Sequence, residues 1–148
     1  MSPHFGLLDE TKMSQEEALL LRAKLHWRGG KRRIEENKGP EGIVTLYDAL
    51  MSAMRWHVLT RHMEKLGKEA KEKLEDDKVV IALLKQTGDL DDSAELKAIE
   101  QTVHQTLEGG DSPTDLGPFM AQIEEILTRL GILPFDDSEL PPEDPDTY

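Results

Sequence analysis

The chain has 148 residues, enough for one domain with a hydrophobic core and too few for two domains of ordinary size. Hydrophobic residues make up 37%, charged residues 32% and aromatic residues 5%, and the absence of cysteine excludes disulfides and thiolate chemistry. The net charge of -12 argues against general affinity for nucleic acid, and no apolar run approaches the roughly 18 to 20 residues of a membrane span. We therefore expect a cytoplasmic protein that makes no contact with a membrane.

The first expected helix begins near Gln15, after an N-terminal segment of residues 1–13. Ser14 and Glu17 fit a capping box, in which each side chain satisfies a backbone N–H that the first helical turn leaves free. The glycine pair at residues 29–30 is predicted to kink or stop this helix, because each glycine weakens a helix by roughly 1 kcal/mol relative to alanine.

A stretch without acidic residues, which we call the basic island, lies between residues 18 and 34. It can contact phosphates of a nucleotide or RNA, with Trp27 stacking on a base. It is equally typical of a solvated helix end, and an acidic tail from the same or a second subunit can cover it. The candidate ligand-binding residues of the island are Arg22, His26, Trp27, Arg28, Lys31, Arg32 and Arg33.

The central helix is predicted over residues 43–62, after the turn signal NKGPEG, because apolar residues recur there at helical spacing. His57 and Arg61 fall on its apolar face, four residues apart. A histidine there is typically a hydrogen-bonded core residue, and the two side chains are also candidates for a ligand pocket or a dimer interface. Residues 64–77 are polar nearly all round and predict a solvated helical continuation.

Three further helical segments are expected, the last over residues 116–130 with a continuous apolar face. Residues 134–148 contain four prolines and no apolar periodicity, which predicts a disordered acidic tail. Deleting the residues from about Asp136 onward is expected to leave the thermal midpoint nearly unchanged. The fold class is therefore all-α, a small up-and-down bundle of about five helices over residues 14–133. Its broad apolar faces exceed what one small domain covers, so we expect a homodimer.

Two helical segments together resemble the HEPN-domain family over residues 14–131. GIVTLYDALMSAMRWHVL follows a first helix and a glycine turn, as does the second HEPN helix, and PFMAQIEEILTRL is similar to the closing helix. The resemblance implies a helical bundle, frequently dimeric, that is either a metal-independent ribonuclease or the partner of a small nucleotidyltransferase. The ribonuclease branch carries an arginine, four to six residues, and a histidine, which Arg55 and His62 match.

Arg55 and His62 should share one flank of the central helix, because seven residues make nearly two helical turns. In a ribonuclease the histidine would take the 2′-hydroxyl proton while the arginine holds the phosphate. The alternative is that both are ordinary solvated charges. We favour that alternative, and with it a non-catalytic interaction module that binds a partner protein or a nucleotide-bearing ligand.

No metal site and no cofactor is predicted. The chain has no His-x-x-x-His or Glu-x-x-His pair for a helical metal site. Helical nucleoside triphosphate pyrophosphatases hold magnesium with acidic pairs spaced like Glu69-x-x-Glu72 and Glu108-x-x-Asp111. Lysines neutralise the first pair and a glycine loop separates the second, so we do not favour this class.

Overall fold

The computed structural model describes residues 14–91, 94–110, 113 and 115–142. All the regular secondary structure in this part is helical, and turns and loops join the helices. The all-α prediction is confirmed. The N-terminal segment 1–13 and Asp111 lie outside the described residues, and none of the described helices is long and apolar enough to cross a bilayer. The elements are α1 (Gln15–Glu35), α2 (Gly39–Arg61), η3 (Met63–Glu69), α3 (Ala70–Glu75), α4 (Asp77–Gln86), α5 (Ala94–Leu107), α6 (Gly117–Arg129) and η4 (Asp137–Glu139), where η marks a 3₁₀ helix.

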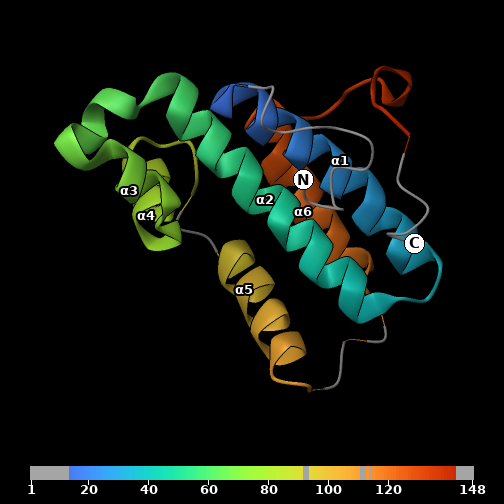
Figure 1. Cartoon of the computed structure of the whole chain (residues 1–148). Coiled ribbons are helices and arrows are strands. Elements are labelled where there is room, and N and C mark those ends of the chain that lie inside the picture. The colour runs from blue at the N-terminus through green and yellow to red at the C-terminus, as the bar shows by residue number, and fades with distance from the viewer. Residues whose placement is uncertain (1–13, 92–93, 111–112, 114, 143–148) are drawn as a thin grey trace.

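Helix α2 is the centre of the fold, and every other described α-helix contacts it. Figure 1 shows α1 and α2 side by side and antiparallel, α6 next to them, and α3 with α4 at the C-terminal end of α2. Helix α5 packs on α2 and α6 below this group. Fully buried side chains at the shared centre include Ile43, Leu46, Leu50, Met54, Leu84, Ile99, Ile123 and Leu127.

The glycine pair does not end α1, which continues to Glu35 and packs tightly on α2. A Cβ atom at Gly30 would lie 2.6 Å from the side chain of Leu46 and 3.2 Å from its backbone nitrogen. Gly42 of α2 faces α1 in the same way, with Ile34 Cγ1 2.5 Å from where its Cβ would stand. The missing Cβ atoms let the two helices approach closely, and the packing this permits offsets the weak helix propensity of glycine.

The polar stretch after α2 is not one solvated helix, so the expectation for residues 64–77 was wrong. The chain breaks at Gly67, whose φ of 74° belongs to the left-handed region that glycine tolerates. Leu66 and Leu74 on either side of the break are buried. These two apolar anchors fold the segment back, and α4 follows in contact with α2.

The first part of the acidic tail lies on the basic island. Phe135 is partly buried against the core, and Lys24 Nζ lies 5.6 Å from the centroid of its ring. Arg28 Nη2 donates a hydrogen bond of 2.7 Å to the carbonyl oxygen of Pro141. Residues 134–142 thus differ from the disordered tail that the sequence predicted, because an aromatic ring and a backbone acceptor dock them on α1. Residues 143–148 lie outside the described residues.

Candidate functional site

The proposed catalytic pair has two separate acidic partners. Arg55 Nη2 donates to a carboxylate oxygen of Asp77, the first residue of α4. His62 Nε2 lies 2.8 Å from Oδ2 of Asp89, which follows the other end of α4. Arg55 and His62 are seven residues apart, which corresponds to a rise of about 10 Å along a helix. Each of the two side chains therefore has a carboxylate partner of its own.

A group of three side chains, His57, His62 and Asp89, meets where α2 ends, and we call it the histidine cluster. His57 Nε2 lies 3.2 Å from Asp89 Oδ1, while His62 contacts the other oxygen of the same carboxylate. One ligand atom from each of the three residues lies within 4.8 Å of the other two. His57 is only 5% exposed, as expected for a histidine on the apolar face, and the other two are half-buried.

The carboxylate of Asp89 is held in place by its own loop. Gly88, with a φ of 83°, turns the chain after α4, and Thr87 Oγ1 donates to Asp89 Oδ2 at 2.6 Å. Burial by itself raises the pKa of Asp89, but hydrogen bonds from Thr87 and His62 and the electrostatic attraction of the nearby His57 outweigh burial and lower that pKa to about 2. The carboxylate is therefore ionised at neutral pH.

The other ring nitrogen of His57, Nδ1, lies near one hydrogen-bond acceptor and one hydrogen-bond donor. Nδ1 lies 3.3 Å from the carbonyl oxygen of Leu130 and 3.1 Å from Nη1 of Arg61. The carbonyl accepts only from a protonated Nδ1, whereas the guanidinium donates only to an unprotonated one. Arg61 is exposed, and its guanidinium also lies 5.4 Å from the ring centroid of Trp56.

Two residues of the basic island, Arg22 and His26, form an ionic network with α2. Arg22 donates to both carboxylate oxygens of Asp48, at 2.8 and 3.2 Å, and His26 Nδ1 contacts the same group. Burial opposes the ionised form of Asp48, but hydrogen bonds from His26 and Arg22 hold the pKa of its carboxyl well below the usual range. Two of the candidate ligand-binding side chains therefore join α1 to α2.

The remaining island residues lie close to groups of their own chain. Arg32 pairs with Glu36 at 3.1 Å, and Arg33 is half-buried. The ring of Trp27 is buried, with Lys31 Nζ 4.9 Å from its centroid. A base could stack on Trp27 only after this ring is uncovered.

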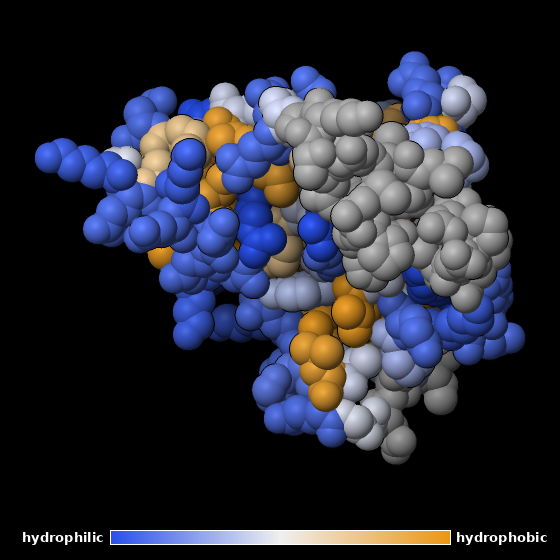
Figure 2. Space-filling view, viewed as in Figure 1, coloured by the Kyte–Doolittle hydropathy of each residue, from blue (hydrophilic) through white to orange (hydrophobic). Residues whose placement is uncertain are grey.

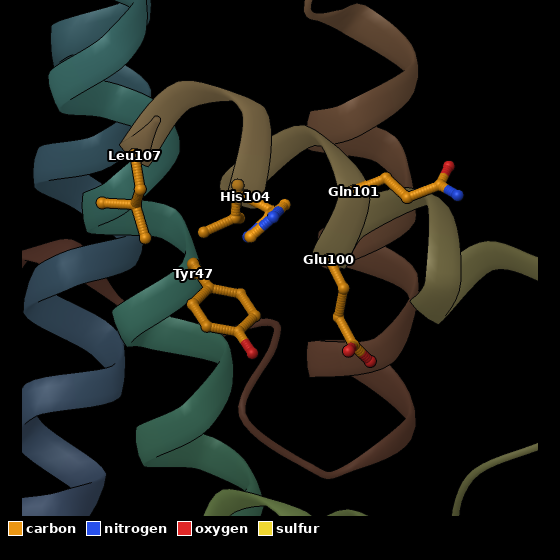
Figure 3. A pocket seen from close by; sticks show the side chains of 6 residues that line it. Tyr47, Glu100, Gln101, His104 and Leu107 are labelled. Atoms are coloured by element: carbon orange, nitrogen blue, oxygen red, sulfur yellow. The ribbon is translucent and has the colours of Figure 1, made fainter. Parts of the chain in front are cut away.

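A hollow of about 400 Å³ lies between α2 and α5, in a region to which the sequence assigned no site. Figure 3 shows Tyr47 of α2 and three side chains of α5, Glu100, His104 and Leu107, around it. Burial, together with the nearby carboxylates of Glu100 and Asp77, raises the pKa of Tyr47, so its hydroxyl remains a donor at neutral pH. The hollow is lined by Tyr47, Glu100, Gln101, Val103, His104 and Leu107.

The hollow is edged by an exposed apolar side chain, since Leu107, which lines it, is 68% exposed. Val44, three residues before Tyr47 on α2, is 41% exposed, and among the described residues these two are the exposed large hydrophobics. Figure 2 shows apolar surface gathered in this region, beside α5. We call the hollow and its rim the α2–α5 groove.

Sequence reasoning missed Asp89 and the α2–α5 groove, because both depend on how α4 and α5 return to α2. The only local signal at Asp89 is the preceding glycine, which marks a turn without saying where the turn points. Comparisons with protein-family models, with curated proteins and with solved structures found no match for this chain.

Proposed function

We propose that the protein is a non-catalytic helical interaction module that forms a homodimer through the α2–α5 groove. The observation that carries this proposal is the 68% exposure of Leu107 at the rim of the hollow. A large exposed leucine beside a concave, partly apolar surface is typical of a protein interface, because a partner removes that surface from water.

A second copy fits the charge pattern of α5. Lys97, Gln101 and His104 of α5 and Glu108, the residue after the helix, are exposed and spaced by four, three and four residues, so they form one stripe. Two copies of α5 paired antiparallel about a two-fold axis near the middle of this stripe place Lys97 opposite Glu108 of the partner subunit. Symmetry makes this attraction occur twice, which is why a second copy is favoured over an unrelated helix.

The oligomeric state of the full chain tests this proposal. Light scattering at micromolar concentration should give a dimeric mass, and Leu107→Asp should give a monomer because a carboxylate would be buried at the interface. Ala82→Asp is the matched control, since Ala82 is also an exposed helical residue but lies on α4. That variant should remain dimeric.

Exchanging the charges at residues 97 and 108 tests the antiparallel pairing of α5 directly. Lys97→Glu should weaken the dimer, and adding Glu108→Lys should restore it, because the pairing of opposite charges is recovered with reversed sign. A monomeric wild-type chain, or a dimer indifferent to Leu107→Asp, would refute this interface. The partners implied by the HEPN resemblance, a nucleotidyltransferase or a nucleotide-bearing ligand, would then be the next candidates.

The second candidate function is a metal-independent, HEPN-like ribonuclease that uses Arg55 and His62. The contact between His62 and Asp89 favours it, because a carboxylate beside one ring nitrogen orients the imidazole as a base. Arg55 would have to leave Asp77 to hold a phosphate. Cleavage of single-stranded RNA in chelator, abolished by both His62→Ala and Arg55→Ala with unchanged helicity, would establish this activity.

A further inference from the structure

We propose that the histidine cluster, His57, His62 and Asp89, binds a divalent transition-metal ion, with Zn²⁺ as the best-suited probe. Two imidazoles and one carboxylate are the ligand set that zinc, iron(II) and related ions accept in proteins. The site lies at the C-terminal end of α2 and shares no residue with the α2–α5 groove, so it is independent of the proposed dimer.

The distances within the cluster are close to those of a metal site. Bonds of about 2.0–2.2 Å to zinc place neighbouring ligand atoms of a tetrahedral site about 3.3–3.6 Å apart. His57 Nε2 lies 3.2 Å from Oδ1 of the carboxylate and His62 Nε2 lies 2.8 Å from Oδ2, so the two rings approach different oxygens of one group. All three ligand atoms fall within 4.8 Å of one another, so small side-chain rotations suffice to close the site.

The ring of His57 supplies an independent reason to expect a ligand. Its Nε2 is fully buried and has no aligned hydrogen bond, although it stands 3.2 Å from Asp89 Oδ1. The distance fits a hydrogen bond but the direction does not. Buried polar atoms are nearly always satisfied, and an ion between Nε2 and the carboxylate would satisfy both groups.

Two polar groups beside the cluster, a backbone carbonyl and a hydroxyl, are of the kind that orient metal ligands in other proteins. The carbonyl of Leu130 is placed to accept Nδ1–H of His57, which turns the Nε2 lone pair toward the ion. Thr87 Oγ1 orients the carboxylate of Asp89 in the same manner. Arg61 is the opposing charge, but it stands on the Nδ1 side of the ring and its side chain is exposed.

An ion held by these residues would join α2 to the loop after α4. Two ligands come from the C-terminal end of α2 and the third from the turn at Gly88. With three protein ligands, a fourth position remains for water or another small ligand, as in zinc sites that are not fully closed by the protein.

The proposal is tested on the full chain after treatment with chelator. Titration calorimetry with ZnCl₂ should give one site in each chain, and CoCl₂ should produce the visible absorption of a protein-bound cobalt ion. Free zinc at about a hundredfold excess over its dissociation constant should raise the thermal midpoint by about 5–10 °C.

Variants locate the site. Asp89→Asn and His62→Gln should each weaken zinc binding more than tenfold and remove the cobalt absorption, and circular dichroism checks that helicity is retained. Asp91→Asn is the matched control, because Asp91 also pairs with a cation, Arg129, at 3.2 Å, but its side chain is 70% exposed and it is not one of the three residues of the cluster. That variant should bind like the wild type.

Two results would overturn the assignment. One is the absence of zinc-dependent heat, absorption and thermal shift in the wild-type chain. The other is binding that persists in both folded variants, Asp89→Asn and His62→Gln, which would place the ion elsewhere.

Discussion

Asp48 is the carboxylate of α2 that forms the ionic contact with α1. It accepts from both nitrogens of the Arg22 fork and contacts His26, which is buried. A carboxylate held in this way is more acidic in the folded chain than in the unfolded chain, where aspartate has a pKa of about 3.9. Its contribution to stability is therefore fully present above that value and is lost as the pH falls below it.

We predict that Asp48→Asn lowers the free energy of unfolding at pH 7 by about 2–3 kcal/mol, because a charge-assisted pair is broken and Arg22 loses its partner carboxylate. The difference from wild type should shrink as the pH falls from 5 toward 3. Urea denaturation across this range measures both effects.

Asp91→Asn supplies the comparison for Asp48→Asn. Asp91 also pairs with an arginine, Arg129, at 3.2 Å, but its side chain is 70% exposed. An exposed pair contributes little, so the loss at pH 7 should stay below about 0.5 kcal/mol. If both variants lost the same free energy of unfolding, the Asp48 network would stabilise the fold no more than an exposed ion pair does.

At the scale of elements, the close approach of α1 and α2 depends on two glycines. Gly30→Ala should destabilise the protein by about 1–3 kcal/mol, because the added methyl would overlap the side chain of Leu46 and press on its backbone. On helix propensity alone the same change would be stabilising. Thermal or urea denaturation thus distinguishes the two effects by sign.

A double-mutant cycle identifies the contact that is responsible. The cost of Gly30→Ala should be smaller when Leu46 is already alanine, since much of the overlap is with the leucine side chain. An undiminished cost in that background would contradict a clash with Leu46.

Helix ends were predictable where one side chain decides them. Ser14, predicted from sequence to cap the first helix, accepts from the backbone N–H of Glu17. The glycine pair of α1 was misjudged because a glycine that weakens an isolated helix and one that permits helix contact are identical in sequence. Buried Leu66 and Leu74 were hidden among charges, so the fold of residues 64–77 was not foreseen.

The same limit applies to the candidate sites. The periodicity of α2 correctly placed His57 on the buried face. It could not supply the acidic partners, because Asp77 and Asp89 reach α2 only after the chain breaks at Gly67 and turns back. Hydrophobic spacing describes one helix at a time, whereas a site made from two helices depends on the path between them.

At the scale of the whole molecule, the described part of the tail contributes to the fold. Removing residues 134–148 should lower the thermal midpoint by about 2–6 °C, because Phe135 and the hydrogen bond from Arg28 to Pro141 are lost. Calorimetry of the truncated chain measures this shift.

Phe135→Ala should reproduce much of the loss, since this ring is the tail's partly buried aromatic anchor. A truncated chain with an unchanged midpoint would instead support the expectation from sequence, in which the tail makes no net contribution to stability.

The position of α2 has a consequence for cooperativity. Every other described α-helix contacts it, so each obtains part of its buried surface from the same side chains. No pair of peripheral helices keeps a complete core once α2 unwinds. The molecule should consequently open from its edges in small local steps, whereas the loss of α2 amounts to global unfolding.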